Sequence, residues 1–209
     1  MLKPGMVAES FHRSDAPDAA RRSDDELVVL AVRKPELFGE LYDRYYGRIL
    51  NYAYRRVFDV VLAEEITSST FFKALRGLRG YDLRGKFGAW LYRIAGNEIR
   101  LHWRARRRRL ANQGEWRKEY GRVRFAAGAD ESAEQIEEQA RAFARVHAAL
   151  RELPERYQTA LALRYFEGMS YEEVAEVMER KVGSVKSLVH RGLKRLGRKL
   201  DRRSATLPQ

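Results

Sequence analysis

The sequence contains no cysteine, which excludes a disulfide framework, a thiolate nucleophile and a cysteine-ligated zinc site. Only four residues are histidine, and none of them stands at a metal-ligand spacing. No apolar run reaches the length of a signal peptide or a membrane span, so a membrane role could come only through a partner. These absences predict a soluble, cytoplasmic protein without a metal or cofactor.

Proline is also scarce. The five prolines stand at positions 4, 17, 35, 154 and 208, and the 118 positions from 36 to 153 have none. Period-two alternation of apolar and polar residues is absent, whereas apolar residues recur at helical spacing. The predicted fold class is therefore all-α, with two small helical domains joined by a flexible linker.

Acidic residues are outnumbered, 29 against 41 Lys and Arg, which gives a formal charge of +12 at pH 7. A surplus of this size indicates a polyanionic partner, and nucleic acid is the expected one. Hydrophobic residues make up 44% of the chain, enough to build a core. Charge alone leaves open a basic ribosomal or chromatin protein, or simply a soluble basic domain.

Composition divides the chain into five segments. Residues 1–24 are rich in Asp, Ser, Ala and Arg and are predicted to be a disordered tail. Residues 25–109 form the first helical domain, with Leu41, Tyr45, Ile49 and Tyr52 at helical intervals. Residues 110–140 contain several glycines, and their first half is basic and their second half acidic; this composition is typical of a linker. Residues 141–200 form the second domain, and 201–209 a C-terminal tail.

The second domain has the pattern of a helix-turn-helix. Pro154 opens a helix that runs to about Phe166, where Gly168 follows as a breaker. Its predicted buried residues are Tyr157, Leu161 and Tyr165. Ser170 stands three residues before Glu173, the spacing of a capping box for a short helix over 171–179. That helix is predicted to bury Val174, Ala175 and Met178, with the small Ala175 allowing a close helix crossing.

The last helix, 182–200, has two opposite faces at 100° per residue. The apolar face holds Val185, Leu188, Val189, Leu196 and Leu200. The polar face is predicted to read DNA, because such helices contact base edges with their N-terminal residues. Its members are Gly183, Ser184, Lys186, Ser187, His190, Arg191 and Lys194. For the Lys and Arg residues beyond Leu196, a solvated basic helix end is the favoured interpretation.

The segment LPERYQTALALRYFEGMSYEEVAEVMERKVGSVKSLVHRGLKRL resembles region 4 of sigma factors of the extracytoplasmic-function (ECF) group. The resemblance implies recognition of the −35 promoter element by the polar face. Two residues depart from the family pattern: Glu179 stands where the turn normally has glycine, and Lys181 where a Ser or Thr cap is usual. A non-glycine residue at positive φ costs on the order of 1 kcal/mol.

The stretch GKFGAWLYRIAGNEIRLHWRARRRR predicts one long helix whose apolar face comprises Phe87, Trp90, Leu91, Ile94 and Leu101. A basic stripe of Arg93, Asn97, Arg100 and Arg104 runs along another face, with Tyr92 and Trp103 beside it. Cations that follow phosphates and rings that stack on bases suit a single strand or an opened duplex. A solvent-exposed basic helix face without any nucleic-acid contact explains the arginines about as well.

This helix resembles sigma region 2, in which F-x-x-W-L-x-x-I-A-x-N leads into an arginine-rich end. The resemblance implies recognition and melting of the −10 element, with Asn97 near a flipped base and Arg106–Arg109 on backbone phosphate. Glu98 in the apolar arc and Leu101 in place of an acid depart from the pattern.

Upstream, LAEEITSSTFFKAL resembles the surface by which the family binds the polymerase clamp helices. The polymerase-binding residues that it implies are Glu64, Glu65, Ser68, Phe71 and Phe72, while Ser69 replaces a frequent acid. The spacing alone also fits an ordinary amphipathic helix.

Together the two motifs imply a sigma factor that brings core RNA polymerase to promoter DNA. Whether a cognate anti-sigma factor holds the two domains is left open. An autonomous helix-turn-helix regulator would explain only the second domain, and usually dimerises on palindromic sites. A nucleic-acid enzyme such as a recombinase needs a nucleophile with a base or a carboxylate cluster, and the sequence shows no such constellation.

Overall fold

The computed structural model describes residues 22–83, 85–113 and 144–204, and every regular element within these ranges is helical. The first domain contains α1 (Asp24–Arg33), α2 (Phe38–Val57), α3 (Val60–Gly77) and α4 (Phe87–Gln113), with short turns η3 (Pro35–Leu37) and η4 (Leu78–Gly80). The second contains a helix over 144–151, α6 (Glu155–Leu161), η5 (Ala162–Phe166), α7 (Tyr171–Met178) and α8 (Val182–Ser204). The predicted all-α fold with two helical domains is confirmed.

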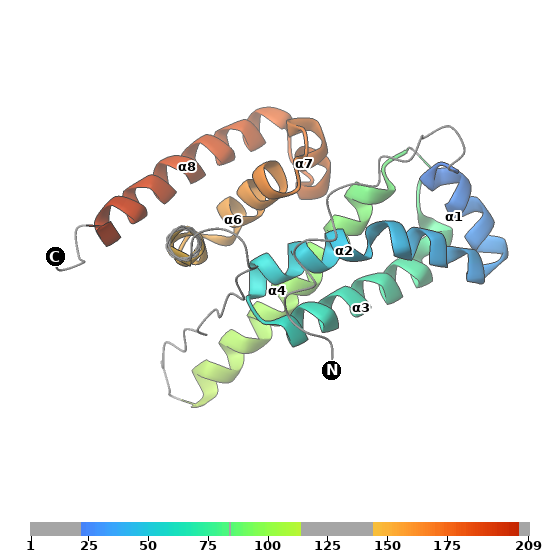
Figure 1. Cartoon of the computed structure of the whole chain (residues 1–209), viewed down its shortest axis with the longest axis horizontal. Helices are drawn as coiled ribbons and strands as arrows, with labels where there is room; N and C mark the ends of the chain where they lie inside the picture. The colour runs from blue at the N-terminus through green and yellow to red at the C-terminus, as the bar shows by residue number, and fades with distance from the viewer. Residues whose placement is uncertain (1–21, 84, 114–143, 205–209) are drawn as a thin grey trace, which may run out of the picture.

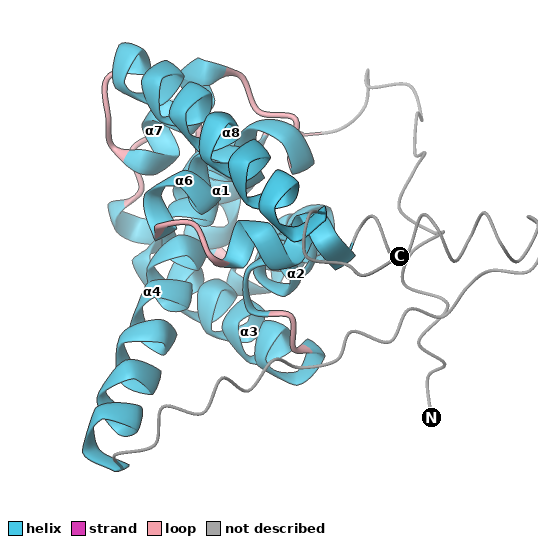
Figure 2. Ribbon diagram, turned by 90° about the vertical axis from the view of Figure 1, so that its left-hand side faces the viewer, coloured by secondary structure: helices cyan, strands magenta, loops and turns pink. Residues whose placement is uncertain are grey.

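The boundaries differ slightly from the predicted ones. Helix α4 continues to Gln113, past the expected end at Arg109, and its C-terminal half extends beyond the rest of the bundle (Figure 2). The remainder of the predicted linker, most of the N-terminal tail and the last five residues lie outside the described residues.

Helix α2 crosses the middle of the first domain, between α3 and the second domain (Figure 1). Its buried face contains Leu41, Tyr45, Ile49 and Tyr52, as the helical spacing predicted. The rings of Tyr45 and Tyr52 lie edge-on against Phe87 and Tyr92 of α4, respectively. The long helix that carries the basic stripe is therefore fixed to the core of the domain by aromatic packing.

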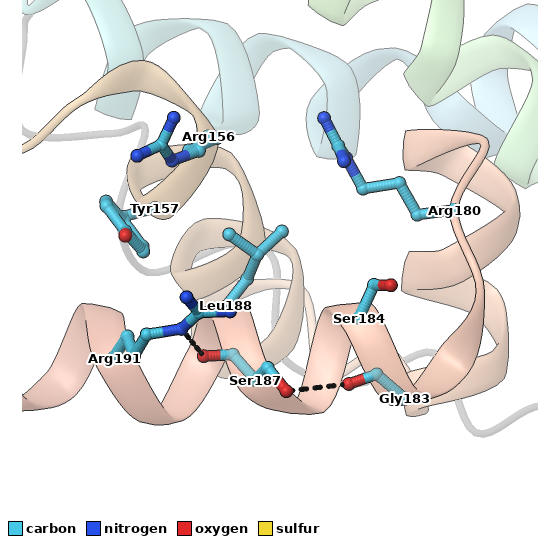
Figure 3. A pocket seen from close by; sticks show the side chains of 8 residues that line it. All are labelled: Arg156, Tyr157, Arg180, Gly183, Ser184, Ser187, Leu188 and Arg191. Carbon is cyan, nitrogen blue, oxygen red and sulfur yellow. Dashed lines mark hydrogen bonds between the residues drawn. The ribbon is translucent and has the colours of Figure 1, made fainter.

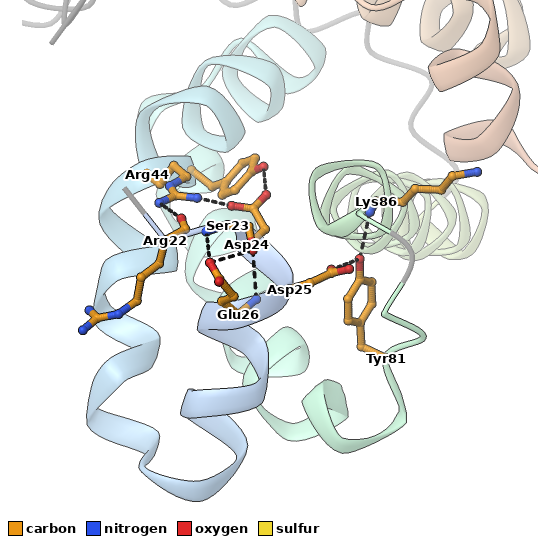
Figure 4. Close-up of polar contacts among 9 residues, drawn as sticks. Arg22, Ser23, Asp24, Asp25, Glu26, Arg44, Tyr81 and Lys86 are labelled. Carbon is orange, nitrogen blue, oxygen red and sulfur yellow. Dashed lines mark hydrogen bonds and ion pairs between the residues drawn. The ribbon is translucent and has the colours of Figure 1, made fainter. Parts of the chain in front are cut away.

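The N-terminus of α1 is held by polar contacts to α2 and to the loop before α4 (Figure 4). Ser23 and Glu26 form a capping box. Asp24 accepts hydrogen bonds from Arg44 and from the Tyr45 hydroxyl. Asp25 accepts from the Tyr81 hydroxyl at 3.2 Å and from the backbone N–H of Gly85 at 2.7 Å. Arg44 also donates to the backbone carbonyl of Arg22, and the backbone N–H of Lys86 donates to the Tyr81 hydroxyl, both at 3.0 Å.

A π-helical turn, η5, corrects the predicted first helix of the helix-turn-helix. Tyr157 and Leu161 are buried as predicted, but Tyr165 is 55% exposed. The backbone N–H of Glu167 bonds to the carbonyl of Ala162, five residues back, which adds a residue to the turn and rotates the following side chains. As a result Phe166, in place of Tyr165, packs against the core.

The turn of the helix-turn-helix forms as the sequence predicted. Ser170 and Glu173 make the capping box at the start of α7. Glu179 ends α7 in the left-handed conformation, with φ 52° and ψ 50°, at the position where glycine was expected. Val174 and Ala175 are buried, while Val177 is buried in place of the predicted Met178, which is only half-buried.

The two domains pack against each other, and His147 lies at their boundary. Its ring is stacked on Phe166, with 5.9 Å between centroids, and meets Phe58 at the end of α2 edge-on at 4.8 Å. Burial, together with the charges of Arg55 and Arg151, lowers the pKa of His147 from 6.5 to about 4.

The stability of the protein is therefore expected to fall in acid. Between pH 4 and 6.5, His147 is protonated in the unfolded chain but neutral in the folded protein. The contribution of neutral His147 to the free energy of unfolding is therefore fully present above pH 6.5 and is lost as the pH falls toward 4. The loss amounts to roughly 3 kcal/mol at most. Urea unfolding of the protein and of His147→Phe at several pH values measures it. If both proteins lose stability equally over this range, His147 is not the group responsible.

Candidate nucleic-acid interface

The N-terminal half of α8 exposes the whole polar face predicted to read DNA. All seven of its members are exposed, whereas Val185, Leu188 and Val189 on the opposite side are buried. The helix is held against α6 at Gly192, where a Cβ would lie 3.2 Å from Leu161 Cδ1. The polar face is thus presented on a rigid helix, as base reading in a major groove requires.

A shallow hollow beside this face contains two arginines that were not among the predicted DNA contacts (Figure 3). Arg156 comes from the first turn of α6 and Arg180 from the turn before α8, and Arg191 lies on the third side. Three guanidinium groups around one hollow supply the charge and the hydrogen-bond donors that a phosphate group needs. One feature of the sequence could have indicated Arg156. A basic residue in the first turn of a helix is unfavourable because it opposes the helix dipole, so its presence there suggests another role.

On α4, Asn97, Arg100 and Arg104 of the predicted stripe are exposed. Arg93 is half-buried, and its guanidinium pairs with Glu179 at 2.6 Å. Arg100 donates a hydrogen bond to the side-chain oxygen of Asn97, which orders the middle of the stripe.

Tyr92 does not lie beside the stripe as predicted. It is fully buried, and its hydroxyl donates to Glu167 of the second domain at 2.6 Å. Burial and the Glu167 charge raise its pKa above the ordinary value. Trp103, the other predicted aromatic, is half-buried and has the guanidinium of Arg106 over its ring at 5.5 Å.

The two departures from the pattern of the long helix have structural explanations. Glu98, the acid in the predicted apolar arc, turns toward α3, where its carboxylate forms an ion pair with Lys73. Leu101, predicted to be core, is 48% exposed, and Ile99 is buried. The apolar face of α4 therefore drifts relative to the predicted phase after Ile94.

The predicted polymerase-binding segment lies on α3. Glu64, Glu65, Ser68 and Phe72 share an exposed face, and the Phe72 ring is 59% exposed. Phe71 does not belong to this face, because it is buried against Phe38 and Tyr42 of α2. Leu75, one turn after Phe72, adds a second exposed apolar side chain.

Within the part of the chain that the structure describes, no three His, Cys, Asp or Glu residues are placed to hold a metal ion. Over the same residues, no helix combines the length and apolar character needed to cross a membrane.

Comparison with protein-family models finds two matches. Residues 41–109 match the model described as Sigma-70 region 2, and residues 143–196 match Sigma-70, region 4. The first match covers α2 to the basic part of α4, and the second covers the helix-turn-helix.

Individual relatives agree with these matches. The chain is 34% identical to the ECF RNA polymerase sigma factor BldN of Streptomyces coelicolor, over 90% of this chain and 70% of BldN. It is also 34% identical to the RNA polymerase sigma-H factor of Pseudomonas aeruginosa, over 87% of this chain and 95% of that protein.

Two solved structures share the fold. One is CnrH in complex with the cytosolic domain of CnrY, with a TM-score of 0.63 and 24% identity over 86% of this chain and 98% of that chain. The other is the sigma factor RpoE in complex with the anti-sigma factor NepR from Bartonella quintana, with a TM-score of 0.63 and 22% identity over 78% and 96% of the respective chains.

Proposed function

The chain belongs to the ECF sigma factors of RNA polymerase, and we propose that its two helical domains divide promoter recognition between them. It directs promoter-specific initiation as a subunit of the polymerase. In the proposed division, α8 reads the −35 element, the stripe on α4 binds the melted −10 element, and the exposed face of α3 binds core polymerase.

The observation that carries this proposal is the exposed polar face of α8 next to the arginine-lined hollow. Arg191 reaches both, so one residue can contact a base edge while Arg156 and Arg180 hold the adjacent phosphates. This arrangement fits a duplex lying across α8 and the start of α6. The domain boundaries at residues 25–109 and 141–200 correspond, in this proposal, to the −10 and −35 functions.

The proposal further places the protein in the cytoplasm and gives it no chemistry of its own. Catalysis belongs to core polymerase, and the chain supplies positioning contacts. Because both solved relatives named above are complexes, one with an anti-sigma factor, we also propose that an anti-sigma factor regulates this chain.

Dependence on polymerase separates this function from an autonomous helix-turn-helix regulator. The test incubates the full chain with promoter DNA, with and without core polymerase, and follows sequence-specific protection. A sigma factor is expected to protect specific sites only with core polymerase, whereas equal protection by the chain alone would favour the autonomous regulator.

The two phenylalanines on α3 provide a further prediction. Phe72→Ala is expected to weaken binding to core polymerase about 30-fold or more, because an exposed aromatic at an interface centre contributes about 2 kcal/mol. The free energy of unfolding of the Phe72→Ala variant should differ from that of the unmodified chain by no more than about 0.5 kcal/mol. Phe71→Ala, in contrast, should cost about 3–5 kcal/mol of stability because that ring is buried. Affinity for labelled core polymerase measures the first effect and urea unfolding the second. If Phe71→Ala weakened polymerase binding and Phe72→Ala lowered the stability instead, Phe72 would not be the ring at the interface.

A further inference from the structure

A tyrosine in the first turn of α6 lies among arginines from two helices. Tyr157 is buried where α8 crosses α6, and a Cβ added at Gly192 of α8 would lie 3.5 Å from the Tyr157 Cβ. The guanidinium carbon of Arg156 is 5.0 Å from the centroid of the tyrosine ring, and that of Arg195 on α8 is 5.2 Å from it. One ring therefore holds two cations from different helices by cation–π contact.

The same ring belongs to the wall of the arginine-lined hollow beside the polar face of α8 (Figure 3). Arg195 lies outside that hollow, but it follows Arg191 by one turn on the same side of the helix, and both side chains are exposed. Tyr157 thus connects Arg195 to the three arginines of the hollow. The resulting row, the arginine track, comprises Arg180, Arg191, Arg156 and Arg195.

The arginine track has no acidic partner within the described residues. None of its four guanidinium groups forms an ion pair there, whereas Lys199, one turn beyond Arg195, is paired with Glu152 at 2.6 Å. A hydrogen bond from Arg156, together with the charges of the neighbouring arginines, lowers the pKa of Tyr157 against the opposing effect of burial. The positive potential along the track therefore remains available to an external polyanion.

The dimensions of the track suit the backbone of one DNA strand. From Gly183, which lines the hollow, to Arg195, α8 rises about 18 Å at 1.5 Å per residue. Because Arg156 and Arg195 each lie about 5 Å from one ring centroid, their guanidinium carbons are no more than about 10 Å apart. Each strand of B-DNA carries one phosphate per about 3.4 Å of helix axis, so the track is long enough to contact several consecutive phosphates.

We propose that the arginine track binds consecutive phosphates of a single DNA strand beside the −35 element, and that Tyr157 is a positioning residue that holds Arg156 and Arg195 toward that strand. This inference rests on the proposed reading of the −35 element by α8. It extends the DNA contact beyond the hollow, to Arg195 in the C-terminal half of the helix. The track supplies affinity and orientation, while base edges are read by the polar face.

The first test pairs Arg195→Ala with neutral phosphates in the DNA. Holoenzyme reconstituted with core polymerase is titrated with promoter duplexes in which a methylphosphonate replaces one phosphate at a time across the −35 element. Arg195→Ala is expected to lower affinity for the unmodified duplex about two- to fivefold, as loss of an exposed charged contact does. It should have little effect on the one duplex in which the phosphate that Arg195 contacts is already neutral.

The same map locates the second arginine. The duplex that cancels the effect of Arg156→Ala should carry its methylphosphonate on the same strand, within about three positions of the phosphate assigned to Arg195. If no single phosphate cancels the effect of Arg195→Ala, or if the two arginines are coupled to opposite strands, the inference is overturned.

Tyr157→Phe and Tyr157→Leu test the positioning role. Phenylalanine keeps the ring, so Arg195 is expected to stay coupled to its phosphate, while the contribution of Arg156 falls because its hydroxyl acceptor is lost. Leucine removes the ring, and both couplings should disappear. A purely structural role would lower the free energy of unfolding of Tyr157→Leu in urea and leave both couplings intact. If Tyr157→Leu does not fold, the split between the two arginines in Tyr157→Phe still decides the role of the ring.

Arg198→Ala is the matched control, because it removes the same charge from an exposed arginine of α8 outside the track. Equal losses on every duplex for Arg195→Ala and Arg198→Ala would mean that net charge alone is responsible, and would overturn the inference. If the unmodified chain gives no promoter binding with core polymerase, it is the proposed function that fails. Binding of the full chain to a random-sequence duplex then decides the track: Arg195→Ala should reduce the slope of log affinity against log salt by about one relative to Arg198→Ala, and equal slopes would overturn it.

Discussion

Arg191→Ala is expected to reduce transcription from a promoter that has a −35 element about tenfold or more, while binding to core polymerase stays unchanged. Arg191 is exposed on the polar face of α8 and lines the hollow with Arg156 and Arg180. A good bidentate contact to a base contributes about 1–3 kcal/mol of discrimination, which corresponds to factors of about 5 to 150. Lys194→Ala, one turn along the same face, should weaken the same step.

Run-off transcription and affinity for labelled core polymerase separate the two steps. Arg198→Ala is the matched control, because Arg198 is exposed on the C-terminal half of the same helix, where a solvated basic end is expected. Arg156→Ala and Arg180→Ala should weaken binding to all promoters alike and reduce its salt dependence, as loss of phosphate contacts does. Normal transcription by both Arg191→Ala and Lys194→Ala would show that the docking face has been placed wrongly.

Asn97→Ala is expected to impair formation of the open complex about tenfold while initial promoter binding changes much less. Asn97 is exposed in the middle of the α4 stripe and is held by Arg100. Contacts to unpaired bases exist only after melting, and a bidentate amide contact to a base edge is worth about 1–3 kcal/mol. The loss should therefore fall on the second step.

Permanganate reactivity of unpaired thymines reports the open complex, and a gel shift at low temperature reports initial binding. Leu101→Ala, an exposed apolar residue of the same helix outside the stripe, serves as the control. Equal losses at both steps would argue against a melting role for Asn97.

Much of the local structure was predictable because it depends on periodicity and capping. The buried face of α2, the capping box at Ser170 and Glu173, and the opposite faces of α8 all follow from the spacing of residues. The left-handed Glu179 was also foreseeable, since the turn geometry requires positive φ whichever residue occupies it.

The errors arise where small rotations decide the environment of a side chain. One extra residue in η5 exchanges Tyr165 for Phe166, and no pattern in the sequence marks a π turn there. Phe71 and Phe72 lie 100° apart on α3, so the motif alone did not show which ring faces solvent. Tyr92 was misplaced because it packs against both α2 and the second domain.

The packing of the two domains could not be predicted from the sequence. Arg93 and Glu179 are 86 positions apart, and neither has a local feature that identifies the other as its partner. One clue was present in the sequence: α7 carries Glu172, Glu173 and Glu176, whereas α8 is basic. The structure adds that the acids at and near α7 have a basic partner within the same chain.

The most direct test of a polymerase-dependent, two-site promoter reader is run-off transcription with purified core polymerase on a library of randomised promoters. The chain is expected to select two motifs at a fixed separation. Arg191→Ala should relax selection of the upstream motif, and Asn97→Ala should affect the downstream one. Selection of a single motif, or transcription that does not require the chain, would contradict it.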